Sequence, residues 1–315
     1  MACLAHPLEQ VQYQLGATRR RSPIHIPWTH DRCVACGETQ PLTLEHVIPQ
    51  AIGGRLTVTF LCEPCNSRFG HQVDHSAKQD PAIATAILRL AQDHPKRAPL
   101  LENLRLLAHS AGGQLPALIK DGTAEVRSQK LPDGSIIQPT VDARRTIERM
   151  LTRAGETPAA VADALERFDS APVDRSESIT PDIHSTNWTV NAMSADPSFS
   201  PVSPVLLTKI AYEFLALHLG GAVYADSPPL VAARRILTSQ VFEPDKVRIE
   251  HLRAGRAHDL HGVVFEGNLP HARVQVRLFG TLAYRVHFVQ LSIGGARYVY
   301  SHSLDSNAEG ISEAL

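Results

Sequence analysis

The sequence predicts an α+β protein in which a small zinc-stabilised module precedes a larger mixed α+β region that ends in an antiparallel β-meander. Three observations support this class. Two Cys-x2-Cys pairs lie near the amino terminus, at a spacing typical of a zinc site. Apolar residues recur at helical spacing through several later segments, and in the last third they alternate with polar residues as in half-buried strands.

Length and composition are those of an ordinary globular protein. The 315 residues are enough for one large domain or two to three modest ones, and we predict boundaries at 1–79, 80–175 and 176–315, or 80–315 as one domain. A net charge of −1 gives no overall attraction to a polyanion, so a nucleic-acid site must come from local charge clusters. Aromatic content of 5% argues against an extended base-stacking surface.

The chain shows no targeting or membrane pattern. No apolar run approaches the roughly 20 residues of a membrane span, and the first residues lack the pattern of a secretory signal. We therefore expect a cytoplasmic protein without a membrane partner. In a reducing compartment, paired Cys-x2-Cys motifs bind metal more often than they form disulfides. Cys3 lies outside this pattern and is expected to be a plain thiol.

The module is expected to consist of strands and one helix held by zinc. β-Branched residues and Pro49 delimit a first strand, and Gly53-Gly54 favours a turn before the return strand. An arm with Arg19-Arg20-Arg21 precedes the module, and it either contacts phosphate or is a solvated leader. In chain order we predict a strand over 24–28, a knuckle at 33–36, strands over 41–48 and 56–61, a knuckle at 62–65, and a helix from Asn66 to about His75.

The later elements follow from caps and periodicity. Asp80-Pro81 and Ser203-Pro204 are typical helix starts, and the second helix is apolar enough to be a core helix. Its polar residues Lys209, Tyr212 and Glu213 are expected to form its polar edge. We predict helices over 80–95, 141–153, 158–168, 203–219 and 229–237, strands over 104–107, 117–126 and 188–190, a turn at 132–134, an antiparallel meander over 247–293, and a frayed tail after 305.

Four cysteine thiolates satisfy tetrahedral zinc completely and leave no open position for catalysis. We therefore predict a structural zinc whose binding supplies folding free energy that so small a unit lacks. The expected ligands are Cys33, Cys36, Cys62 and Cys65.

Three residues inside this frame have the chemistry of an active site. Glu45 and His46 are neighbours at a strand end, so their side chains point different ways, and Asn66 directly follows the last cysteine. Carboxylate and amide oxygens are hard ligands that suit Mg²⁺ or Mn²⁺. An imidazole with an ordinary pKa near 6.5 takes a proton from water at neutral pH. The pattern predicts a catalytic metal on Glu45 and Asn66, with His46 as general base.

EHVIPQAIGG followed by CEPCNSRFG, framed by the two Cys-x2-Cys pairs, resembles the HNH endonucleases, also called His-Me finger or ββα-metal nucleases. It is most similar to the zinc-stabilised branch with the motif EHxxP…GG…CxxCN, and the resemblance covers about residues 33–75. It implies metal-dependent hydrolysis of DNA phosphodiester bonds, with His46 activating water and Glu45 and Asn66 holding the metal. RNA as substrate and a homodimer are left open.

One residue of the family pattern is absent. No Asn lies between His46 and Asn66, where the family has one that fixes the backbone around the base; Thr57 or Thr59 could substitute, or the role is unfilled.

Several other residues are candidates for weaker roles. Arg55 and Arg68 flank the site and are candidates for phosphate binding. His71 is an alternative metal ligand, and Asp74 either shares the helical face of Asn66 or is solvated at a helix end. Four arginines of the β-region are expected either to form a basic face or to be ordinary solvated residues of the sheet: Arg273, Arg277, Arg285 and Arg297.

Three function classes remain from the sequence. The leading one is a metal-dependent HNH endonuclease, a phosphodiester hydrolase. The second is a catalytically inactive, zinc-stabilised nucleic-acid-binding protein, and the third is an interaction protein in which the zinc unit is only a scaffold. Cutting of DNA that depends on His46 separates the first class from the other two.

Overall fold

The structure is a computed structural model. It describes residues 23–170 and 202–314, apart from gaps at 111–112, 122, 128, 131–135, 138–139, 254–258, 268–270 and 294–296. The arginine run at 19–21, Cys3, the turn at 132–134 and the strand at 188–190 lie outside the described residues. Contacts group residues 1–97 with 193–315 in one compact unit and residues 98–192 in a second. The three-segment domain division stays a prediction.

The zinc module is a three-stranded sheet followed by a helix. Strands β1 (His25–Ile26), β3 (Thr57–Cys62) and β2 (Leu42–His46) lie in that order, with β1 parallel and β2 antiparallel to β3. A short helix η2 (Gln50–Ile52) lies between β2 and β3. The module therefore has the predicted strand–turn–strand–helix order.

The module's helix begins earlier than predicted. α1 (Glu63–Phe69) starts inside the second knuckle rather than at Asn66, because Pro64 is well suited to a first helical turn. The helix continues through a π-helical turn, η3 (Gly70–Asp74), into α2 (His75–Ala77).

Gly54 closes the turn between the strands of the module. A Cβ at this position would lie 1.8 Å from the carbonyl oxygen of Ile48, so no other residue fits without moving the backbone. Gly53 adopts a φ of 90°, which favours glycine as well. The Gly-Gly pair therefore lets β3 return beside β2, as its sequence predicts.

Helix α3 (Pro81–Asp93) follows the module, and a 3-10 helix η4 (Pro95–Leu101) leads out of the first unit. Asp80 caps α3: its Oδ1 accepts hydrogen bonds from the backbone N–H groups of Ala82 and Ile83. Its Oδ2 accepts from the N–H of Ser203 at 2.9 Å, at the start of the next helix of this unit. One carboxylate thus joins two helix starts that are distant in sequence.

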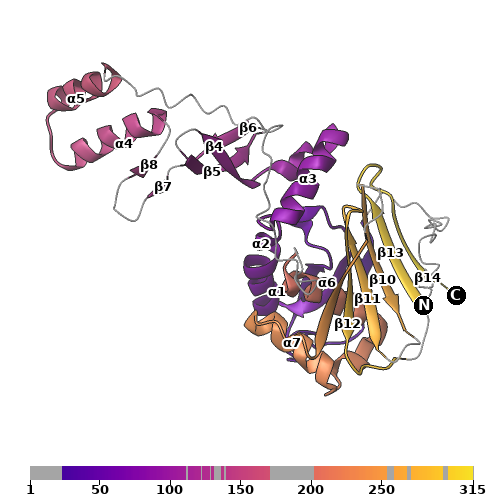
Figure 1. Ribbon diagram of the computed structural model, residues 1–315. Helices are drawn as coiled ribbons and strands as arrows, with labels where there is room; N and C mark the ends of the chain where they lie inside the picture. The colour runs from indigo at the N-terminus through magenta and orange to yellow at the C-terminus, as the bar shows by residue number, and fades with distance from the viewer. Residues whose placement is uncertain are drawn as a thin grey trace. The chain divides into compact units, whose positions relative to one another are not determined.

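Helix α6 (Pro204–Leu219) is the central helix of the first unit and packs against η3 and the sheet strands (Figure 1). It is followed by η5 (Gly220–Tyr224) and α7 (Pro228–Ser239). The segment Pro204–Tyr224 is long and apolar enough to cross a membrane by length and composition alone. Here residues 206–216 are all buried in the unit, so α6 is a core helix, as predicted.

A six-stranded antiparallel sheet completes the first unit and confirms the predicted β-rich end. Its order is β14-β13-β10-β11-β12-β9, so β10, β11 and β12 follow one another as in a meander, β13 and β14 form a hairpin, and β9 pairs with β12. Buried and half-exposed residues alternate along β11, as expected for a sheet with one covered face. The strands are β9 (Val247–Leu252), β10 (Leu260–Glu266), β11 (Ala272–Leu278), β12 (Leu282–Phe288), β13 (Arg297–Ser303) and β14 (Glu309–Ala314).

The prediction of a frayed tail is wrong. β14 pairs with β13, and Glu309 accepts a hydrogen bond from the N–H of Ile24 at 3.0 Å. Glu309 also forms an ion pair with Arg55 at 2.5 Å. The chain end is thus held to the zinc module by long-range contacts that no local pattern reveals.

The second unit contains a small antiparallel sheet and two helices. The strand predicted over 117–126 is two strands, because Asp121 turns the chain with a φ of 49°. The strands are β4 (Arg105–Ser110), β5 (Gly113–Lys120), β6 (Thr123–Val126), β7 (Gln129–Lys130) and β8 (Ile136–Ile137). Helices α4 (Thr140–Arg153) and α5 (Pro158–Ser170) confirm the predicted pair.

Candidate metal centre and active site

The four predicted zinc ligands converge. Their sulfur atoms all lie within 4.8 Å of one another, and the sulfurs of Cys36 and Cys62 are 3.7 Å apart. A tetrahedral zinc with bonds of about 2.3 Å requires sulfur spacings of about 3.8 Å. A hydrogen bond from Cys65 lowers the pKa of the Cys33 thiol to about 4, which favours the thiolate form that binds zinc. The residues present fit a structural zinc.

Side chains from elsewhere in the first unit support this centre. Arg68 donates a hydrogen bond to the sulfur of Cys65 at 3.3 Å, and the Tyr212 hydroxyl of α6 donates to the carbonyl oxygen of Val34 at 2.7 Å. The Tyr224 hydroxyl donates to the carbonyl oxygen of Arg32. The first knuckle is therefore anchored to α6 and η5. Phosphate binding by Arg68 stays a prediction.

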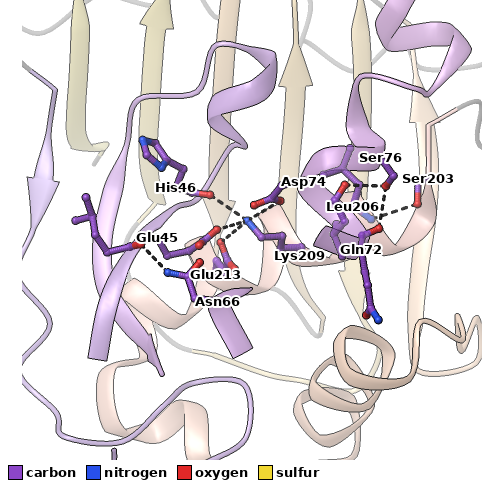
Figure 2. Close-up of polar contacts among 12 residues, drawn as sticks. Glu45, His46, Asn66, Gln72, Asp74, Ser76, Ser203, Leu206, Lys209 and Glu213 are labelled. Atoms are coloured by element: carbon purple, nitrogen blue, oxygen red, sulfur yellow. Dashed lines mark hydrogen bonds and ion pairs between the residues drawn. The ribbon is translucent and has the colours of Figure 1, made fainter. Parts of the chain in front are cut away.

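Glu45 lies on β2 with its side chain only 3% exposed, and its partner is a lysine rather than solvent. Lys209 of α6, which is 0% exposed, donates from Nζ to Glu45 Oε1 at 2.6 Å and to the carbonyl oxygen of His46 at 3.0 Å. The same Nζ lies 3.3 Å from Asp74 Oδ1 and 3.3 Å from Glu213 Oε2. Figure 2 shows the oxygens of these residues pointing toward the ammonium. We call this group the Lys209 cluster.

The expected polar edge of α6 is wrong, and the Asp74 side chain, which is 18% exposed, faces Lys209 at 3.3 Å. Tyr212, like Lys209 and Glu213, is fully buried. Burial acts to lower the pKa of Lys209, but the surrounding carboxylates outweigh burial and raise it, so the ammonium keeps its charge. Burial raises the pKa of Glu45 and of Glu213, against the opposing effect of Lys209.

His46 lies at the end of β2, directly opposite Thr57 of β3. Its half-buried imidazole is turned away from the Lys209 cluster, as Figure 2 shows, so Glu45 and His46 face different sides of the strand as predicted. Burial lowers the pKa of His46, and the charge of Lys209 lowers it further while Asp74 opposes this. The imidazole is therefore neutral at neutral pH and able to accept a proton.

Asn66 acts on the backbone of β2. Its Nδ2 donates to the carbonyl oxygen of Leu44 at 2.7 Å and to the Thr43 hydroxyl at 2.8 Å. The Thr57 hydroxyl instead donates to the carbonyl oxygen of Ile24 at 3.3 Å, on the β1 side. A contact that holds the strand before His46 thus comes from Asn66, whereas a substitute role of Thr57 or Thr59 stays a prediction.

A surface hollow of about 450 Å³ lies beside Asn66. Thr43 and one side of the helix α1–η3 form its wall, with His71 and His75 at its edge. Glu45 and His46 are not among its lining residues.

The surroundings of Glu45 and Asn66 can be compared with what the predicted catalytic metal site requires. Asn66 lines the hollow and turns its amide nitrogen toward β2, whereas Glu45 is buried and holds an ammonium ion. In this arrangement the Glu45 carboxylate is occupied by Lys209 and is not free to share a divalent ion with Asn66. That assignment and the role of His71 as an alternative ligand remain predictions.

The other predicted phosphate contacts, in the module and on the large sheet, are partly engaged in ion pairs. Arg55 is 18% exposed and bound to Glu309. On the sheet, Arg285 and His287 both contact Glu250, at 2.9 and 3.1 Å, beside a hollow of about 400 Å³ that Arg273 also lines. The side chain of Arg297 lies outside the described residues. The sheet face is thus mixed in charge rather than uniformly basic.

Comparison with known proteins agrees with the resemblance in the module. Residues 33–81 match the family model described as HNH endonuclease. Neither a curated protein nor a solved structure matches the chain. The match includes Glu45, His46, Asn66 and Asp74, and it ends before α6, so Lys209 lies outside it. Residues 33–81 therefore match an HNH endonuclease module, and their four cysteines are positioned to form a zinc site, consistent with the zinc-type branch.

Proposed function

We propose that this protein is an endonuclease that hydrolyses phosphodiester bonds of DNA, with His46 as the general base. The observation that carries the proposal is the placement of His46 inside the matched segment, on a strand whose backbone is fixed on both sides. Asn66 binds the carbonyl oxygen of Leu44, and Lys209 binds that of His46. A general base needs this kind of fixed orientation.

The chemistry proposed for His46 is proton transfer. The neutral imidazole takes a proton from a water molecule while the water oxygen forms a bond to phosphorus. The phosphorus–oxygen bond to one nucleotide then breaks, and the leaving oxygen departs with the bonding electron pair. Because burial and Lys209 keep the pKa of His46 below its ordinary value, the base remains unprotonated at neutral pH.

Cutting of supercoiled plasmid tests this proposal. The zinc-loaded chain is assayed in buffer alone and with Mg²⁺ or Mn²⁺, so that the same gel shows whether cutting requires a divalent ion. We expect His46→Ala to reduce cutting by about 100-fold or more, the usual contribution of a general base. His251→Ala, at an exposed histidine of β9, is the matched control and should cut like the wild type.

Two results would contradict the proposal. Equal cutting by wild type and His46→Ala would remove His46 from the mechanism. A wild-type chain that leaves plasmid DNA intact under all of these conditions would contradict the proposed DNA endonuclease.

One observation favours a second candidate, a nucleic-acid-binding protein that does not cut. The carboxylate expected on the metal is already paired with Lys209 at 2.6 Å. For this candidate, plasmid would be shifted in a gel by wild type and His46→Ala alike, with no nicked product.

A further inference from the structure

The Lys209 cluster has the composition of a metal site with an ammonium ion at its centre. Three carboxylates and one carbonyl oxygen surround Lys209 Nζ, and they come from β2, η3 and α6 itself. Hard divalent ions in proteins are bound by this type of oxygen donor. The distances of 2.6 to 3.3 Å are those of N–H···O contacts. Mg²⁺–oxygen bonds are shorter, at about 2.0–2.1 Å.

We propose that Lys209 is the resident cation of this HNH module: its ammonium takes the place of a divalent ion, so the wild-type chain does not bind Mg²⁺ or Mn²⁺ through Glu45. The inference concerns cation binding alone. It holds whether or not the protein cuts nucleic acid.

Helix α6, which lies outside the matched segment, holds Lys209 firmly among the three carboxylates. The helix is buried from Leu206 to Ala216, and Glu213, four residues beyond Lys209, lies on the same face and faces the same ammonium. A lysine with 0% exposure cannot exchange its partners for water, so Nζ remains between the carboxylates.

The π-helical turn η3 supplies the third carboxylate. Here the N–H of His75 bonds to the carbonyl oxygen of Gly70, one residue further back than in an α-helix. Because this turn contains one extra residue, the side chains after it point in a different direction around the helix axis than the α-helical spacing from α1 would give. Asp74 comes to lie 3.3 Å from Lys209 Nζ, whereas Asn66 remains on the hollow.

The charges of the cluster define the test. Three carboxylates face one ammonium, and apart from their ion pairs with Lys209, Asp74 Oδ1 and both Glu213 oxygens accept no hydrogen bond within the described residues. Removal of the ammonium alone would leave buried carboxylates without a cation. Lys209→Met keeps the length of the apolar stem and removes the charge, so it should turn the cluster into a divalent-ion site.

Calorimetric titration with Mn²⁺ measures this directly, on the zinc-loaded full chain without nucleic acid. We expect the wild type and Glu45→Gln to give the same Mn²⁺ titration. Lys209→Met should gain one Mn²⁺ site per chain, at least tenfold tighter than any wild-type binding, and Lys209→Met with Glu45→Gln should lose it. Mn²⁺ should also raise the melting temperature of Lys209→Met. Lys246→Met, at an exposed lysine, should titrate like the wild type.

Either of two results would overturn the inference. One is wild-type Mn²⁺ binding that Glu45→Gln abolishes, because a metal would then use Glu45 beside the ammonium. The other is a folded Lys209→Met chain without the new site. If Lys209→Met does not fold, the comparison of wild type with Glu45→Gln still decides. Because no cutting is measured, failure of the nuclease proposal leaves these results intact.

Discussion

His261 on β10 joins the large sheet to the zinc module through both of its ring nitrogens. Its Nδ1 accepts the N–H of Phe279 at 3.3 Å, so in the neutral ring Nε2 carries the proton and donates to the carbonyl oxygen of Ile52 at 2.9 Å. The ring is fully buried. A second proton on Nδ1 would remove the acceptor for Phe279 and place a charge in the core.

The first prediction concerns acid stability. Burial lowers the pKa of His261 to about 4, below the value near 6.5 of an unfolded chain. Between these values the unfolded state binds more protons, so the stability from this histidine is complete above pH 6.5 and falls as the pH drops toward 4. At roughly 1.4 kcal/mol per pH unit, the complete loss of this contribution to the free energy of unfolding is about 3 kcal/mol.

Urea unfolding at pH 7.5 and pH 5.5 measures this effect. We expect the wild type to lose more stability between the two values than His261→Gln, whose amide has both a donor and an acceptor but no charge change. His251→Gln, at an exposed position, should behave like the wild type. Equal losses in wild type and His261→Gln would show that His261 does not titrate as described.

At the scale of elements, helix starts matter more here than helix interiors. Asp80 Oδ1 caps α3 and Asp80 Oδ2 binds the N–H of Ser203, directly before α6. The first cap is local and visible in the sequence pattern. The second joins two segments 123 residues apart, so it exists only in the folded unit.

The second prediction follows from this double contact. Asp80→Ala should lower the free energy of unfolding by about 2–3 kcal/mol, since it removes an N-cap worth about 1 kcal/mol and leaves a partly buried N–H without its charged acceptor. Chemical denaturation measures the change. Asp93→Ala, at the exposed end of α3, should cost at most about 0.5 kcal/mol. A loss for Asp80→Ala no larger than that of Asp93→Ala would contradict the double role.

At the scale of the whole molecule, the zinc module is part of the first compact unit rather than an appendage. Tyr212 holds its first knuckle, His261 holds η2, and Glu309 holds both β1 and Arg55. The folding free energy from zinc is therefore shared with α6 and the large sheet.

The third prediction is that zinc loss destabilises the unit beyond its knuckles. Cys62→Ser should lose zinc, lower the melting temperature and weaken the anchoring of α6, which we expect to appear as faster amide exchange along this helix. Metal analysis and hydrogen exchange measure these effects. Cys3→Ser, which lies outside the zinc pattern, should keep both properties. Zinc retained at full stoichiometry in Cys62→Ser would contradict the ligand set.

The amino-acid sequence alone was enough to predict the zinc ligands, the opposed directions of Glu45 and His46, and most helices. All of these depend on short-range spacing: two cysteines per knuckle, alternation along a strand, and caps such as Asp80. These signals lie within a few residues of one another, so they need no knowledge of the fold.

Sequence patterns were misleading where a residue's partner lies far away in the chain. Lys209 and Glu213 look like the polar edge of an apolar helix. The sequence does hold a signal of the true arrangement, because opposite charges four residues apart on an otherwise apolar helix are typical of a buried ion pair. Asp74 looks like a solvated helix end because a π-helical turn leaves no clear sequence pattern. Strand order and the pairing of β14 likewise depend on long-range contacts.

The sequence by itself determined the zinc-type HNH pattern of residues 33–81, which the family match supports, and the position of His46 at a strand end. Only the tertiary structure decided what faces Glu45. Its partner, Lys209, is 164 residues away in the sequence, on α6. The physical reason is that a buried carboxylate must meet some positive charge, and which charge it meets depends on what the fold packs against it.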